Sequence, residues 1–189
     1  MAKNAATVSF DNERLQLVNS SDDVIGYESK LAAHLGKGQL HRAFSIFIVN
    51  EKGQAALQRR STNKLLWPGY WANSCCSHPR EGETIMDAAY RRLSEELGTQ
   101  TTLQWLYKFE YRSEYNDVGT EHELCSVLIG HIDSKRELSP NQTEIDDISW
   151  VDWHEIGAWL NDPHIPTTPW LALEWSHLNE HHLNAVLNL

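Results

Sequence analysis

The stretch WPGYWANSCCSHPREGETIMDAAYRRLSEELG, residues 67–98, joins a turn-rich loop to an amphipathic segment. The loop half carries thiol and imidazole side chains close together, in residues 75–79. In the second half apolar residues recur every three or four positions, which predicts a helix over 84–97 that ends at Gly98. The apolar positions of this helix are Ile85, Ala88, Ala89, Leu93 and Leu97.

The predicted helix also carries two basic and two acidic residues near its end. Arg92 and Glu96 are four positions apart, so they share a side of the helix, and Arg91 has the same relation to Glu95. Such pairs are typical of a solvated helix face. Beside a loop that holds a thiol and an imidazole, they also indicate a functional site.

The flanking sequence predicts strands on both sides of this stretch. Residues 44–49 are a continuous apolar run, and the turn residues after them predict a hairpin with 55–60. Further strands are expected over 13–18, 103–115, 121–131 and 148–153, helices over 154–160 and 170–189, and a short helix or a loop over 27–35. We therefore expect an α/β (α+β) fold, in which helices cover a mixed β-sheet sandwich.

Length and composition indicate one globular domain. The chain has 189 residues, of which 41% are hydrophobic and 22% charged, enough for a single sizeable core. We expect residues 1–189 to form one domain, with 1–12 as a loose terminus and 170–189 as a C-terminal helix.

The charge is unevenly distributed along the chain. Residues 1–112 hold 14 Lys or Arg and 12 Asp or Glu, a balance of +2, whereas residues 113–189 hold 2 and 14, a balance of −12. The net charge of −10 argues against a nucleic-acid partner. An anionic ligand is therefore expected to contact the first part, while most acids of the last part are expected to be solvated.

The sequence also indicates the compartment. No apolar run reaches the roughly 18–20 residues that a membrane span needs, and no secretory signal follows Lys3. The three cysteines, two of them adjacent, suit a reducing environment better than a disulfide framework. We expect a cytoplasmic protein without a membrane partner.

Two alternating segments place acidic and aromatic side chains on strand faces. Over 103–115, the alternation puts Trp105, Tyr107, Phe109 and Tyr111 on one face. Over 121–131, the shared face holds Glu121, Glu123, Cys125, Val127 and Ile129. If the turn between the strands lies at 117–119, Tyr111 is expected to pair near Cys125.

Five side chains are candidate ligands of a divalent transition metal: His34, His41, His78, Glu121 and Glu123. Imidazole and carboxylate are suitable ligands for such an ion. The residues alone do not decide between this role and a surface or core role for each histidine, because their convergence depends on the fold.

The quoted stretch resembles a Nudix box, whose end reads R-E-U-x-E-E-x-G and here reads RRLSEELG, residues 91–98. Two positions depart from that pattern. Arg92 replaces its inner Glu, and Ser77 stands where its leading Gly falls. These departures, with NSCCSHP in front, resemble one branch of the superfamily, the type I isopentenyl-diphosphate isomerases, over residues 24–175.

The resemblance implies an enzyme that interconverts isopentenyl and dimethylallyl diphosphate by adding a proton at one carbon and removing another. It implies Cys76 and Glu123 as the acid/base pair, assisted by Tyr111. The five candidate ligands would form one centre for Mn²⁺ or Zn²⁺, with Mg²⁺ as a further option. A second cation, Mg²⁺, bound by Glu96 and the backbone carbonyl of Cys76, would accompany the diphosphate.

The resemblance also implies the substrate contacts, which are Lys30, Arg60, Lys64, Arg92 and Trp170. The first four are cations that suit a diphosphate. The indole of Trp170 would face the carbocation. Cys75 and Cys125 are expected to be inert core residues. The expected partner is thus a small prenyl diphosphate, bound by a monomer or a homodimer.

Two other functions remain open from the residues. A Nudix hydrolase of a nucleoside diphosphate would use Glu95 and Glu96, but it would need neither Arg92 nor the Cys/His loop. A metal-binding domain without catalytic activity would account for the histidines but leave the set of cations unexplained.

Overall fold

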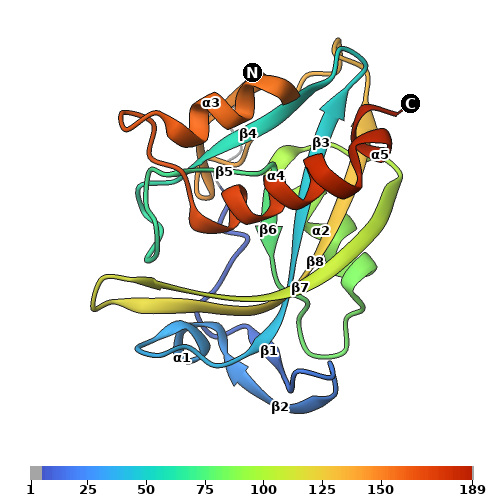
Figure 1. The fold of residues 1–189 in the computed structure, drawn as a ribbon. Helices are drawn as coiled ribbons and strands as arrows, with labels where there is room; N and C mark the ends of the chain where they lie inside the picture. Colours follow the sequence, from blue (N-terminus) through green and yellow to red (C-terminus); the bar gives the residue numbers. More distant parts are fainter. Residues whose placement is uncertain (1–5, 189) are drawn as a thin grey trace.

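The central strand of the fold is β3 (His41–Asn50), which is buried along nearly its whole length. In the computed structural model, which describes residues 6–188, β3 pairs antiparallel with β1, β4 and β6 and parallel with β8. One nine-stranded mixed sheet results (Figure 1). Its other strands are β1 (Arg14–Val18), β2 (Val24–Ser29), β4 (Gln54–Arg60), β5 (Trp71–Ala72), β6 (Cys75–Ser77), β7 (Leu103–Tyr115), β8 (Gly119–Ile132) and β9 (Ile145–Asp152).

Helices cover the sheet on two sides (Figure 1). Because successive side chains of a strand point to opposite faces, Phe44, Ile46 and Ile48 of β3 pack with α2 (Ile85–Leu97). Phe47 and Val49 belong to a second cluster, which includes residues of α3 (Ile156–Asn161), α4 (Pro169–His181) and α5 (Leu183–Leu187). The predicted sandwich of a mixed sheet covered by helices is confirmed.

The helix that ends the quoted stretch has the predicted bounds. The Thr84 hydroxyl accepts a hydrogen bond of 3.1 Å from the amide of Asp87 and so caps the N-terminus of α2. Gly98 ends the helix in the left-handed conformation, with φ at 61°. Leu93 and Leu97 are fully buried, and each such burial contributes about 1.5–3 kcal/mol.

The strands β7 and β8 form a long hairpin that differs from the predicted one in two ways. A register shift lies between Trp105 and Tyr107, so Trp105 leaves the aromatic face and is half exposed. Tyr111 pairs with Glu123 rather than near Cys125, because the turn is centred one residue earlier than predicted.

The N-terminal part contains more strand than expected. The region 27–35 was expected to be a short helix or a loop, but its first three residues end β2, and the helix α1 (Lys30–His34) follows. Residues 6–12 contain no helix or strand, yet they are not loose. The carbonyl of Val8 accepts a hydrogen bond of 2.7 Å from Arg92, and the Ser9 hydroxyl contacts Lys30. The first five residues of the predicted loose terminus lie outside the described residues.

The C-terminal part differs from the prediction at its strand and at its last helix, which is divided into two. The strand β9 begins three residues earlier than predicted, and a 3₁₀ turn, η1 (Trp153–Glu155), leads into α3. The predicted helix over 170–189 breaks at His182, which has a non-helical φ of −131° and stacks on the ring of Tyr107. Leu189 lies outside the described residues. None of the helices within 6–188 combines the length and hydropathy required to cross a bilayer.

Candidate active site

A cavity of about 410 Å³ opens at one end of β3. Its wall combines side chains that are distant in the sequence, because α1, the loop after β6, the hairpin β7–β8 and the start of α4 meet there. Imidazole, thiol, carboxylate, guanidinium and indole groups all face it, from His34, Cys76, His78, Arg92, Glu123 and Trp170.

The five candidate metal ligands lie together, and all of them except His41 line this cavity. Their ligand atoms are all within 4.8 Å of one another, and all five side chains are nearly or fully buried. The three imidazole rings lie 4.7–5.0 Å apart, centroid to centroid. His41 pairs with Glu123 across the parallel strands β3 and β8, so sheet register brings these two ligands together.

A glycine allows α1 to approach β8 closely. Leu35, the residue after α1, forms an isolated bridge with Gly119. A Cβ atom on Gly119 would lie 2.4 Å from the carbonyl oxygen of His34. Only a residue without a side chain fits this contact, which places His34 beside Glu121, with 2.9 Å between Nε2 and Oε2.

Backbone carbonyls fix the orientation of two imidazoles. Nδ1 of His34 lies 2.7 Å from the carbonyl oxygen of Lys30, and Nδ1 of His41 lies 2.7 Å from that of Gln39. Because a carbonyl oxygen can only accept, each Nδ1 carries the proton and donates it. The lone pair of each Nε2 is then available to a metal.

Burial keeps two histidines of the cluster, His41 and His78, neutral. It lowers the pKa of His41 to about 3, with the nearby His34 adding to the effect, and it holds the pKa of His78 well below its usual range. Burial and the charge of Glu121 raise the pKa of Glu123. Burial opposes ionisation of Glu121 too, but its neighbours His34 and Arg60 together outweigh burial and lower the pKa of Glu121. Neutral imidazoles beside carboxylates are the protonation states that a metal requires.

Unpaired polar atoms support the same conclusion. Within residues 6–188, His41 Nε2 and Glu121 Oε2 are buried without a hydrogen-bond partner, since the His34 Nε2 that lies 2.9 Å from Oε2 carries a lone pair and does not donate. A buried polar atom without a partner costs about 1–3 kcal/mol, and a divalent cation would satisfy both. The donor set of three imidazoles and two carboxylates therefore fits a divalent transition metal.

The two adjacent cysteines point to opposite faces of β6. Cys75 is fully buried and packs in the core with α2, whereas Cys76 faces the cavity. The Cys76 thiol donates a hydrogen bond of 2.6 Å to Oδ1 of Asn73 and lies 3.5 Å from the Ser45 hydroxyl. Burial raises the pKa of both thiols. Asn73 begins the NSCCSHP motif, but the sequence analysis assigned it no role.

Glu123 faces the same cavity from β8. Its Oε2 accepts a hydrogen bond of 2.8 Å from the hydroxyl of Tyr111, and its Oε1 lies 3.0 Å from Nε2 of His78. Glu123 and Cys76 thus open onto one cavity rather than onto different surfaces. A carboxyl whose pKa is raised can hold or release a proton near neutral pH.

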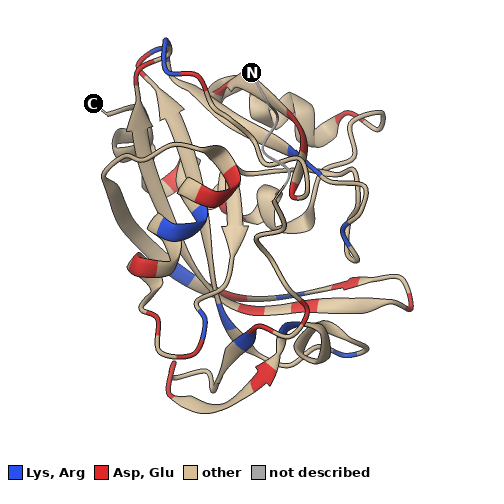
Figure 2. Ribbon diagram, turned by 180° about the vertical axis from the view of Figure 1, so that it is seen from behind, with Lys and Arg blue, Asp and Glu red and all other residues tan. Residues whose placement is uncertain are grey.

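Three predicted cations gather around an acid that the sequence analysis overlooked. Lys64 pairs with Glu144, Nη2 of Arg92 lies 3.4 Å from it, and Lys30 contributes to its electrostatic environment. All four residues line the cavity. Charges of both signs are mixed around α2 (Figure 2). The only sequence signal for Glu144 was its place in the acidic last part of the chain.

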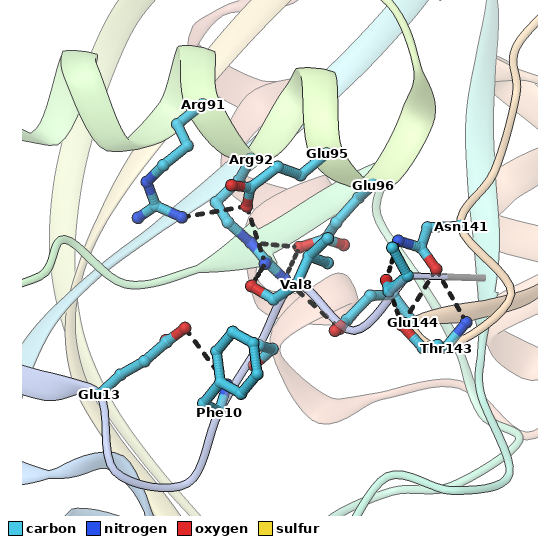
Figure 3. Close-up of polar contacts among 12 residues, drawn as sticks. Val8, Phe10, Glu13, Arg91, Arg92, Glu95, Glu96, Asn141, Thr143 and Glu144 are labelled. Carbon is cyan, nitrogen blue, oxygen red and sulfur yellow. Dashed lines mark hydrogen bonds and ion pairs between the residues drawn. The ribbon is translucent and has the colours of Figure 1, made fainter. Parts of the chain in front are cut away.

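The predicted contact of Glu96 with Mg²⁺ stays a prediction, and the structure gives this carboxylate an internal partner. It is buried, it is not part of the cavity wall, and it accepts a hydrogen bond of 2.9 Å from Nε of Arg92 (Figure 3). The Arg92 guanidinium also contacts Glu95 and the carbonyl of Val8. In this structure Glu96 is therefore the internal partner of Arg92.

Two large aromatic rings, those of Tyr111 and Trp170, also line the cavity. The Trp170 ring meets Trp67 edge-on at 5.2 Å and lies 6.2 Å from Tyr111. The guanidinium of Arg60 lies 5.3 Å above the Trp170 ring and donates to the carbonyls of Leu66 and Trp67. This indole is thus already presented to a cation.

Comparisons with known proteins agree on family and fold. The family model described as NUDIX domain matches residues 39–171. Isopentenyl-diphosphate Delta-isomerase 1 of Photorhabdus laumondii is 40% identical over 174 residues, which cover 91% of this chain and 98% of that protein. Isopentenyl-diphosphate Delta-isomerase 2 of Aromatoleum aromaticum is 41% identical over 144 residues, covering 76% of this chain and 75% of that protein. Among solved structures, DR0079 of Deinococcus radiodurans shares the fold, with a TM-score of 0.69 at 23% identity over 85% of this chain and 96% of that one.

Proposed function

This chain belongs to the isopentenyl-diphosphate Δ-isomerase branch of the Nudix superfamily, and we propose that it interconverts isopentenyl diphosphate and dimethylallyl diphosphate. The supporting observation is that a thiol, Cys76, and a carboxyl, Glu123, open onto one largely buried cavity with cations along its wall. This combination suits proton transfer at carbon on a substrate held by its diphosphate.

The reaction needs one proton donor and one proton acceptor. A proton adds to the terminal carbon of the alkene, which leaves a tertiary carbocation at C3, and loss of a proton from C2 then forms the internal double bond. The formula is unchanged, and no redox cofactor takes part. We assign the two transfers to Cys76 and Glu123, without deciding which group adds the proton.

Tyr111 is assigned as the partner of Glu123. The hydrogen bond from its hydroxyl favours the carboxylate, while burial and Glu121 favour the neutral acid. These opposed influences on its pKa suit a carboxyl that alternately takes and gives a proton.

The five-residue cluster is proposed to bind one divalent cation, Mn²⁺ or Zn²⁺ by ligand type. His34, His41, His78, Glu121 and Glu123 would hold it. When bound, such an ion neutralises the adjacent carboxylates and fixes Glu123 beside the cavity. Mg²⁺ is proposed to enter with the diphosphate, because it prefers oxygen ligands.

Lys30, Lys64, Arg60 and Arg92 are proposed to bind the diphosphate. All four line the cavity, and Lys64 and Arg92 now contact Glu144. A magnesium diphosphate would bring both negative and positive charge to the part of the cavity that these four cations line. We propose Glu96 and the backbone carbonyl of Cys76 as the magnesium contacts, and Glu144, which lines the cavity beside Arg92, as a further carboxylate at this end of the cavity.

Trp170 is proposed to stabilise the carbocation. A cation over an indole gains about 0.5–2 kcal/mol when desolvated, and Trp170 is only 2% exposed. The adjoining rings of Trp67, Tyr111 and Tyr115 exclude water from this end of the cavity. Exclusion matters because water would capture the cation as an alcohol.

We extend the proposal to the whole chain. Residues 1–189 act as one catalytic domain, since strands of a single sheet and the helices beside it supply most of the site residues. All three cysteines are free, which fits a reducing compartment such as the cytoplasm.

The function is tested by incubating the purified protein with isopentenyl diphosphate, Mn²⁺ and Mg²⁺ in D₂O. NMR should show dimethylallyl diphosphate with deuterium at carbon. The rival hydrolase activity is tested with a panel of nucleoside diphosphate derivatives. Release of phosphate or a nucleoside monophosphate, without isomerisation in the first assay, would contradict the proposal.

A further inference from the structure

A further buried carboxyl, that of Glu174, lies behind the Cys76 thiol as seen from the cavity. It is on α4, four residues and therefore one helical turn after Trp170, and its side chain is fully buried. While Trp170 lines the cavity, Glu174 points at the face of β3 that carries Ser45. The start of α4 thus contributes Trp170 to the cavity wall and Glu174 to the buried contact with β3.

The groups around Glu174 lead to Cys76. Its Oε1 accepts from the Cys125 thiol at 3.8 Å, and the Ser45 hydroxyl is the other polar side chain that faces the carboxyl. The Ser45 Oγ lies 3.5 Å from the sulfur of Cys125 and 3.5 Å from that of Cys76. Ser45 and Cys76 are direct neighbours across the β3–β6 pair, so this contact is set by sheet register.

Packing alone does not account for a carboxyl at this position. Oε2 of Glu174 is among the buried atoms within residues 6–188 that have no hydrogen-bond partner. An apolar residue of similar size would fill the same space without that desolvation cost. A buried polar group that weakens the fold is expected where function requires it.

Burial also keeps the Glu174 carboxyl protonated, so that it has a proton to donate. It raises the pKa of Glu174 to about 8, so the neutral acid predominates at neutral pH. A proton on Oε1, the oxygen that has polar neighbours, can be donated to Ser45, which leaves the Ser45 hydroxyl free to donate to the sulfur of Cys76. The Cys76 thiol in turn donates to Asn73, so every hydrogen bond in the chain has one direction.

We propose that Glu174 is a positioning residue for the reaction, which orients the Cys76 thiol through the hydroxyl of Ser45. This inference rests on the proposed function, because it requires Cys76 to be one of the two proton-transfer groups. Glu174 itself does not line the cavity and is not expected to touch the substrate.

The test compares Glu174→Leu, Glu174→Gln and Ser45→Ala in the metal-loaded enzyme. Glu174→Leu should lower kcat by about tenfold and leave KM within about twofold, because only the orientation of the thiol changes. Glu174→Gln should keep kcat within about threefold of wild type, since a carboxamide retains a donor and an acceptor. Glu180→Gln, an exposed change on the same helix, serves as the control.

Two readouts separate positioning from a merely structural role. The melting temperature of Glu174→Leu should equal or exceed that of wild type, since the variant removes a buried unpaired oxygen. Combining Glu174→Leu with Ser45→Ala should lower kcat no further than either change alone, because both act along one chain of contacts.

Several outcomes would overturn the inference. These are wild-type kcat in Glu174→Leu, an equal loss in Glu174→Leu and Glu174→Gln, or additive losses in the double variant. If Glu174→Leu fails to fold, Glu174→Gln and Ser45→Ala still decide, because Ser45→Ala must lower kcat and Glu174→Gln must not. Full activity in Cys76→Ala would instead contradict the proposed function itself, so the two failures are distinguishable.

Discussion

The Tyr111 hydroxyl donates a hydrogen bond of 2.8 Å to Oε2 of Glu123, and the two residues face each other directly across the β7–β8 pair. Tyr111→Phe removes this donor and keeps the ring. We expect kcat to fall by about tenfold, equivalent to the loss of one hydrogen bond of about 1.4 kcal/mol. Steady-state kinetics will check this, and KM should stay unchanged because the diphosphate end is untouched. An unaltered kcat would show that the hydrogen bond does not influence proton transfer.

The adjacent cysteines provide a matched pair of variants. Cys76 faces the cavity and Cys75 faces α2, so Cys76→Ala should lower kcat by about 10²-fold or more, the usual weight of a general acid or base. Cys75→Ala should keep kcat and lose about 1 kcal/mol of stability, measured by urea unfolding. The reverse result would mean that the wrong sulfur has been assigned to the reaction.

Metal removal should affect stability as well as activity. Without an ion, Glu121 and Glu123 repel each other in a buried site, and His41 Nε2 lacks a partner. Dialysis against a chelator should abolish isomerisation and lower the melting temperature by about 5 °C or more. Adding Mn²⁺ or Zn²⁺ back should restore both. Unchanged melting and activity after complete removal, verified by metal analysis, would exclude the metal from the mechanism.

Gly119 controls the position of a ligand without being one. In Gly119→Ala, the new methyl group would meet the carbonyl oxygen of His34 at 2.4 Å, so α1 must move away from β8. We expect metal affinity to fall by about 10–100-fold, as when a group that orients a ligand is lost. Titration with Mn²⁺ or Zn²⁺ will measure it. Gly82→Ala is the control, since no atom lies within 4 Å of its added Cβ, although its positive φ adds local strain.

Substrate binding should weaken at alkaline pH. Burial, with the charge of Lys64, lowers the pKa of Lys30 to about 8. Lys30 is therefore mostly charged below that pH and loses its charge as pH rises through it, which removes one cation from the diphosphate. KM should rise by up to about fivefold between pH 8 and 9. Lys30→Arg should remove this rise, because a guanidinium stays charged; the same rise in that variant would assign it to another group.

Much of the local structure could be predicted because short-range patterns encode it. The helix Ile85–Leu97 followed from apolar spacing with Thr84 and Gly98 at its ends, and β7 followed from alternation. Where a local pattern was interrupted by a contact from elsewhere, prediction failed. His182 breaks the last helix and stacks on Tyr107, and Trp105 leaves the aromatic face of β7 at a register shift.

By itself the sequence determined the side-chain types of the candidate site, the strand and helix periods, and the family resemblance carried by residues 67–98. Only the tertiary structure decided that Tyr111 faces Glu123, that Glu144 rather than Glu96 lines the cavity, and that Glu174 lies behind Cys76. The reason is physical. Periodicity follows from the steric limits of neighbouring residues, whereas register and convergence depend on pairing between segments far apart in the chain, where a shift of one residue moves a side chain to the other face.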